Sequence, residues 1–362
     1  MIDAAAFRQA ESQVRQSLNS WRPIQIQSPH IFANSGFPVR IETIQELVML
    51  VDTMQENRFD PYMVELGGMT DAELGQFVAS LVAFVQWYAT VFRGGEVPVP
   101  LSTMIAHFAL NKKIMSYPNH RRILEIGPGC GYLSFYLAGN KNVETYCQVE
   151  VTESFYVFQN LLNTCLYGPH FVEHVTKPPI YKNTDFQPAQ ASGFYEGEVS
   201  PTLHYAPKPT CEHFPWWETP KLRERKFDII TSNANFTEMS EPAFQSYAQL
   251  ISQCLDVNGM VLAQCLGGGH TPIVNIIRTF ESLGFRVLAL IHKEREMVTE
   301  NMILVREGHP SYDHAPAELT HKPYLSMEPL WVQQTFAKSQ NGTIRSAQEV
   351  LGLVREKLLH IK

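Results

Sequence analysis

The sequence predicts an α/β fold in which helices cover both faces of a mostly parallel sheet, preceded by a helical segment. Two observations carry this prediction. From residue 119 onward, short apolar segments typical of buried strands alternate with segments of helical periodicity. The first of these strands runs into a turn with three glycines, and an apolar helix follows. At 362 residues, 44% of them hydrophobic, the chain can also bury a large core.

The first 118 residues are expected to form a helical cap. Apolar residues recur at intervals of three and four in segments 3–21 and 41–55, and segment 71–95 reads as a strongly apolar helix that ends at Gly94-Gly95. This cap either only covers the pocket of the following domain or also supplies a homodimer contact.

Residues 119–307 are predicted to form the central domain, and residues 308–362 a C-terminal extension with a closing helix at about 344–361. Within the domain, segment 168–226 is rich in Pro, His, Tyr and Trp. Connections of this length are usually functional lids or disordered linkers, and the aromatic content favours a packed lid. The predicted strands are Arg122–Ile126, Thr145–Val149, Phe227–Ser232, Met260–Leu266, Phe285–Ile291 and Asn301–Arg306.

Charge and cysteine usage narrow the classes of partner. The formal net charge is −7 without a basic block, so we expect neither nucleic acid nor an anionic membrane surface as a partner. We see no signal peptide and no window long and apolar enough to span a bilayer, and therefore expect a cytoplasmic protein. The six cysteines form no CxxC pair, which predicts buried thiols. Cys211 and His213 are the only close ligand-type pair, and we predict no required metal.

The segment "RILEIGPGCGYLS" is a strand-to-helix turn of the kind that binds nucleotides. Its glycines, Gly127, Gly129 and Gly131, are evenly spaced, whereas a dinucleotide fingerprint would place its third glycine at the position of Tyr132. A Walker loop would need a GK[ST] sequence that is absent here. A dehydrogenase is therefore a weaker alternative.

Glu125, at the end of the strand, indicates the charge of the ligand. A carboxylate beside a phosphate-binding turn would repel a pyrophosphate, whereas it would attract a ligand that carries an ammonium or another cationic group. We therefore expect a positively charged ligand at this turn.

With these residues in place, "ILEIGPGCGYLS" resembles motif I of class I S-adenosylmethionine-dependent methyltransferases. The resemblance implies a Rossmann-like sheet and S-adenosyl-L-methionine as cofactor. Its amino-acid part would lie near Glu125, Gly127, Pro128, Gly129, Gly131 and Tyr132. It also implies that Glu150, nineteen positions after Gly131, binds the ribose hydroxyls. Two alternatives stay open, namely that Glu150 only helps to cap a helix and that Glu153 is the ribose acid.

The segment "SNANFTEM" resembles the N-x-x-S-x-x-E-M signature of a family of sugar O-methyltransferases, with Thr237 or Ala234 in place of the serine. "HFPWW" resembles the Pro-Trp pattern of the same family. Asn233 and Asn235 at a strand end can hold a hydroxyl or the cofactor. Glu238 can accept a substrate proton or only cap the next helix. Trp216 and Trp217 either stack on adenine or a sugar, or simply pack.

Methyl transfer to a hydroxyl needs one base, and we select His270, which follows "CLGGG", as a second catalytic candidate beside Glu238. The prediction is methylation of a small polar molecule, foremost a sugar-like hydroxyl. An N- or C-methyltransferase of another small metabolite and a non-catalytic cofactor-binding protein remain as alternatives.

Overall fold

The computed structural model describes residues 4–17, 37–51, 58–92, 97–175, 209–266, 271–291, 300–316 and 323–359. Within these ranges the chain forms a nine-stranded sheet with the order β3-β4-β2-β1-β5-β6-β8-β7-β9. The strands are β1 (Arg122–Ile126), β2 (Thr145–Glu150), β3 (Phe171–Glu173), β4 (Thr210–Pro215), β5 (Phe227–Asn233), β6 (Leu255–Gln264), β7 (Phe285–Ile291), β8 (Asn301–Arg306) and β9 (Tyr324–Leu325).

The strands from β3 to β6 are parallel, whereas β8 is antiparallel to both of its neighbours and β9 is antiparallel to β7. Strand order reverses between β1 and β5, because β1 continues to β2 on one side and the chain later returns to β5 on the other. Ligands of open parallel sheets bind at such a switch point, beyond the carboxyl ends of the strands. The predicted α/β class is confirmed.

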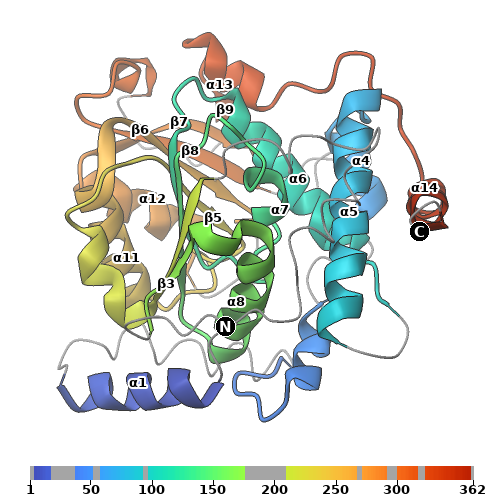
Figure 1. The fold of residues 1–362 in the computed structure, drawn as a ribbon. Coiled ribbons are helices and arrows are strands. Elements are labelled where there is room, and N and C mark those ends of the chain that lie inside the picture. Colours follow the sequence, from blue (N-terminus) through green and yellow to red (C-terminus); the bar gives the residue numbers. More distant parts are fainter. Residues whose placement is uncertain are drawn as a thin grey trace.

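Helices cover both faces of the sheet (Figure 1). One face packs against α11 (Glu241–Cys254) and α12 (Ile273–Ser282). The other packs against α6 (Leu101–Ser116), α7 (Ser134–Leu137), α13 (Leu330–Thr335) and the end of α8 (Glu153–Tyr167). Strand residues alternate between these two apolar layers, as the two-residue period of a strand requires.

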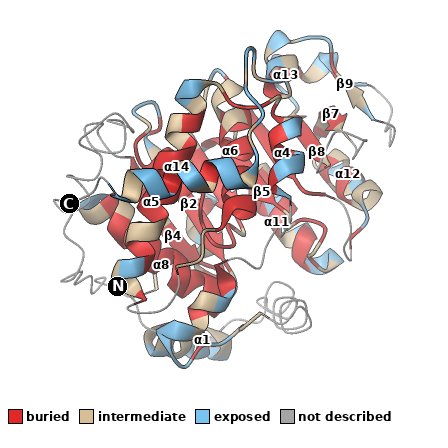
Figure 2. Ribbon diagram, turned by 90° about the vertical axis from the view of Figure 1, so that its right-hand side faces the viewer, coloured by how far each residue is buried: buried red, intermediate tan, exposed pale blue. Residues whose placement is uncertain are grey.

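The N-terminal segment adds a further layer of helices. It comprises α1 (Ala4–Ser17), the 3₁₀ helix η1 (Ile44–Leu50), α4 (Phe59–Glu65) and α5 (Asp71–Val91). Apart from α1, these elements share one core with α6, α7, α8 and the C-terminal α14 (Ala347–Leu359). Figure 2 shows the strands and α6 largely buried and exposed positions on α1 and α14.

Several predicted boundaries differ from the structure. Within segment 41–55, residues 44–50 form a 3₁₀ helix. Its buried residues Leu47 and Leu50 are three positions apart, and residues at this spacing lie on the same side of a 3₁₀ helix. β6 begins at Leu255, five residues before the predicted Met260, because the polar residues Asp256 and Asn258 interrupt the apolar pattern at its start. The predicted lid contributes β3, β4 and the 3₁₀ helix η3 (Trp216–Leu222) to the ordered domain. Its middle, 176–208, lies outside the described residues, so a lid there stays a prediction.

One expectation about apolar segments was wrong. Helix α5 is long and apolar enough to cross a membrane by length and composition alone. However, 67% of its most apolar window is buried inside the protein, as in a core helix. A capping box between Thr70 and Glu73 begins this helix, and Phe77, Phe84 and Trp87 are among its buried side chains.

Candidate cofactor site

The glycine turn lies directly after β1, at the switch point of the sheet. Gly127, Gly129 and Gly131 all have left-handed backbone angles, with φ of 66°, 58° and 70°. Side chains rarely tolerate this region, so the three glycines are needed for the course of the chain. A Cβ atom on Gly127 would also lie 1.3 Å from Nδ2 of Asn235, which follows β5. The loops after β1 and β5 thus meet at the expected crevice, and Pro128 is buried within the turn.

Glu125 is fully buried beneath this turn. Its Oε2 accepts a hydrogen bond from the Tyr146 hydroxyl, whereas its Oε1 has no partner among the described residues. Burial raises the pKa of the Glu125 carboxyl to about 7. A buried acceptor without a donor is costly, so this atom marks a place where a ligand donor would be stabilised.

A chain of buried polar side chains holds Glu125 in place. Gln148 Nε2 donates to the Tyr146 hydroxyl at 2.7 Å, and Asn163 Nδ2 donates to Gln148 Oε1 at 2.5 Å. Ser134 Oγ, at the start of α7, donates to Asn163 Oδ1 at 2.8 Å. Each of these side chains is satisfied within the described network, which fixes the orientation of the Tyr146 hydroxyl and therefore of the carboxylate.

Glu150 ends β2 and is 3% exposed. Its Oε1 accepts from the backbone N–H groups of Val151 and Thr152 at 2.7 and 2.8 Å, and its Oε2 accepts from Gln159 Nε2 at 3.0 Å. Burial raises its pKa to about 7 as well. Both oxygens already have donors, so ribose hydroxyls would have to use the remaining lone pairs of this carboxylate.

Gln159 is a site residue that the sequence analysis missed. Its Nε2 also donates to the carbonyl oxygen of Gly129 at 2.6 Å, while its Oε1 is buried without a partner among the described residues. The side chain thus links the glycine turn to Glu150 and adds a second open acceptor there. The available signal was the run of polar residues at 159, 160 and 163 on the buried face of an otherwise apolar helix.

Asn233 and Glu238 lie at and after the end of β5, on one side of the switch point. Asn233, the last residue of β5, is 8% exposed, and its Oδ1 accepts from Gln264 Nε2 at 3.4 Å. Glu238 is partly buried and its carboxylate has no hydrogen-bond partner within the described ranges. Burial alone raises its pKa to about 7. Glu238 stands before α11, whose N-cap is Ser240, so the capping alternative finds no support in this geometry.

The aromatic candidates lie in packed surroundings. The Tyr132 ring is part of the helical core, and its hydroxyl donates to the carbonyl oxygen of Val51 at 3.0 Å. Trp216 follows β4 and packs with Phe7 of α1, while its Nε1 donates to Glu11 at 3.2 Å. Their contact with a cofactor stays a prediction. His270, the other catalytic candidate, lies outside the described residues.

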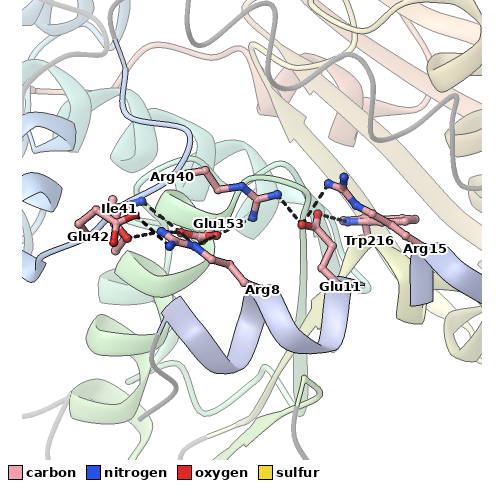
Figure 3. A network of polar contacts seen from close by, with 8 residues as sticks. All are labelled: Arg8, Glu11, Arg15, Arg40, Ile41, Glu42, Glu153 and Trp216. Carbon is pink, nitrogen blue, oxygen red and sulfur yellow. Dashed lines mark hydrogen bonds and ion pairs between the residues drawn. The ribbon is translucent and has the colours of Figure 1, made fainter. Parts of the chain in front are cut away.

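Helix α1 is tied to this edge of the sheet by a network of charges (Figure 3). Arg8 donates to both oxygens of Glu153, at 2.9 and 2.8 Å, and Arg40 donates to Glu153 at 2.5 Å and also to Glu11. Glu153 is the first residue of α8 and its side chain is fully buried. Its carboxylate is thus engaged by two arginines at a helix N-terminus, which favours the structural role over that of a ribose acid.

Two expectations about side-chain chemistry can be compared with the described residues. All six cysteines are buried and none is in a disulfide, which confirms the prediction of buried thiols. Across the described ranges no group of three or more His, Cys, Asp or Glu side chains is arranged to hold a metal ion.

The described residues form a mostly parallel α/β sheet with helices on both faces, and S-adenosylmethionine-dependent methyltransferases are among the solved structures similar to it. One similar solved structure is a TehB-like S-adenosylmethionine-dependent methyltransferase from Corynebacterium glutamicum, with 12% identity and a TM-score of 0.36 over 61% of this chain and 95% of that one. Another is the magnesium protoporphyrin IX methyltransferase of Synechocystis with bound S-adenosylmethionine, with 11% identity and a TM-score of 0.37 over 74% of this chain and 100% of that one. A spermidine synthase is also similar, with 15% identity and a TM-score of 0.35 over 68% of this chain and 74% of that one. No family model and no curated protein matches this chain.

Proposed function

We propose that this protein is an S-adenosyl-L-methionine-dependent methyltransferase whose cofactor binds at the glycine turn. The observation that carries the proposal is the unpartnered Oε1 of Glu125, a buried carboxylate oxygen directly before three left-handed glycines. An ammonium group supplies the donor and the charge that this oxygen lacks. A pyrophosphate would add negative charge instead, which disfavours a dinucleotide.

The residues present fit the cofactor. Glu125 and Gln159 offer open acceptors for its ammonium group, the three left-handed glycines shape the turn without side chains, and Glu150 ends β2, where the ribose would bind. When bound, the sulfonium supplies the methyl group. The chain's own part is to align an acceptor, exclude water and take up a proton.

We propose a sugar-like hydroxyl as the acceptor and Glu238 as the base. With the cofactor bound, its sulfonium would supply the methyl group in exchange for the hydroxyl proton, and the Glu238 carboxylate would take up that proton. A carboxyl with a pKa of about 7 is partly ionised at neutral pH and can accept this proton. A small-molecule acceptor and a cytoplasmic location belong to the same proposal, and amine or carbon acceptors are the alternative.

Replacement of Glu238 by Gln tests the base. We expect the rate of labelled methyl transfer from S-adenosylmethionine to small molecules of a cell extract to fall by about 10²–10⁴-fold. The affinity for S-adenosylhomocysteine, measured by calorimetry, should stay within about twofold, because Glu238 is not one of the proposed cofactor ligands. Glu241→Gln, an exposed glutamate three residues later, is the matched control. Equal rates for both variants would remove Glu238 from this role.

The pKa of Glu125 predicts pH-dependent cofactor binding. The fraction of ionised carboxylate rises with pH through about 7, so the affinity for S-adenosylhomocysteine should increase about tenfold between pH 6 and pH 8, with release of a proton. Calorimetry in buffers of different ionisation enthalpy measures both quantities. Glu125→Gln should bind weakly with a flatter pH profile, and Glu238→Gln should keep the wild-type profile.

A wild-type protein that binds the cofactor but transfers no label to any extract would be a non-catalytic binding protein. Binding of a nicotinamide dinucleotide, detected by its fluorescence, with no binding of S-adenosylhomocysteine would favour a dehydrogenase. These two results distinguish a methyltransferase, a non-catalytic binding protein and a dehydrogenase, because each of these classes predicts a different combination of ligand binding and methyl transfer.

A further inference from the structure

A cavity of about 650 Å³ lies at the edge of the sheet formed by β7 and β9. It is bounded by the end of α4, by α6, by the end of β7, by β9 and by residues 335–338 at the end of α13. Its volume is within the range of small-molecule sites. No residue of the glycine turn lines it, so it is a separate cavity.

The wall combines apolar side chains with an excess of positive charge. Three lysines and a single glutamate line the cavity, and one of the lysines, Lys112, also pairs with Glu73 at 2.7 Å just outside it. Most of the other lining residues are apolar: Leu66, Ala109, Leu290, Ile291, Leu325 and Phe336. Lys338 is exposed, Lys112 is partly buried and Lys113 is buried, so the three lysines differ in their distance from solvent. An apolar surface with this charge suits a ligand that has an apolar body and an anionic group.

Lys113 is a buried, hydrogen-bonded cation in the wall of the cavity. It is 5% exposed, and its Nζ donates to Gln264 Oε1 at 2.7 Å and to Asn301 Oδ1 at 2.9 Å. Its only carboxylate partner in the described structure, Glu65, is 3.5 Å away. Burial lowers the pKa of the Lys113 ammonium, because a buried cation is poorly solvated. An anion in the cavity would therefore stabilise the charged form of this side chain.

We propose that this cavity binds a small amphipathic anion, such as an aromatic carboxylate or sulfonate, with its apolar body against β7 and β9 and its anionic group towards the lysines. The site is independent of the proposed cofactor site and of methyl transfer. Gln264 accepts from Lys113 and donates to Asn233, so this side chain joins the two regions.

Anilinonaphthalene sulfonate is a suitable probe, because phenylnaphthylamine has the same rings without the charge. We expect one sulfonate molecule to bind per protein, detected by its fluorescence, and the neutral amine to bind at least about tenfold more weakly. Saturation with S-adenosylhomocysteine should leave the sulfonate affinity unchanged. Equal affinities of the two probes would refute the proposal that the cavity prefers an anion. Displacement of the sulfonate by S-adenosylhomocysteine would refute the proposal that the two sites are separate.

Substitutions of exposed residues at the rim of the cavity test whether the probe binds there, and they leave the protein core unchanged. Lys338→Glu should weaken sulfonate binding about tenfold, whereas Lys141→Glu, an exposed lysine outside the cavity, should change it less than about twofold. Ala337→Trp should fill the opening and abolish binding. Unchanged melting temperatures verify that the variants fold. If Lys338→Glu and Lys141→Glu have equal effects, or if Ala337→Trp binds normally, this site is refuted.

Discussion

Substitution of Gly127 by Val is expected to weaken S-adenosylhomocysteine binding by at least about 100-fold, or roughly 2.7 kcal/mol. A β-branched residue is strongly disfavoured at φ of 66°, and its Cβ would displace the Asn235 side chain from the switch point. Both effects distort the turn that would receive the amino-acid part of the cofactor. Calorimetric titration measures the change in affinity.

Gly75→Val is the matched control, because Gly75 lies in α5 and a Cβ there would have no atom within 4 Å. It should bind S-adenosylhomocysteine like the wild type and keep its helix, because valine has a higher helix propensity than glycine. Retention of affinity in Gly127→Val, with the fold intact by circular dichroism, would show that the cofactor does not bind at this turn.

Removal of both Arg8 and Arg40 by alanine should lower the free energy of unfolding by about 3 kcal/mol. The Glu153 side chain is fully buried, and of its donors only the backbone N–H of Ile41, at 3.1 Å, would remain. A buried charge without its partners destabilises far more than a lost surface pair does. Urea unfolding followed by circular dichroism gives the difference.

Glu42 provides the internal control for this network. It pairs with Arg8 at 2.9 Å but is 77% exposed, so Glu42→Ala should cost less than about 0.5 kcal/mol. A double arginine variant as stable as Glu42→Ala would show that α1 and Arg40 do not hold Glu153 in solution. Because α1 also covers Trp216, the same double variant should make tryptophan fluorescence more sensitive to quenchers.

The sequence predicted a strand with its correct bounds where the residues of that one segment are enough to identify it. The apolar runs of β1, β7 and β8 have the predicted bounds, because strands buried on both faces need continuous apolar residues. β4 had no predicted range, since it contains Glu212 and His213, although "HFPWW" at its end was expected to be the end of a strand. Both are accommodated by partners from elsewhere: Arg225 pairs with Glu212, and the Tyr156 ring stacks on His213 at 3.9 Å.

The sequence by itself determined the glycine turn, the acid before it and the alternation of strands and helices, because backbone conformation and burial periodicity depend on neighbouring residues. Only the tertiary structure decided that Glu125 keeps one open oxygen, that Gln159 joins the turn to Glu150, and that α1 binds Glu153 through two arginines. Those contacts join side chains from segments far apart in the chain, and their hydrogen bonds depend on distances that only the packed fold sets.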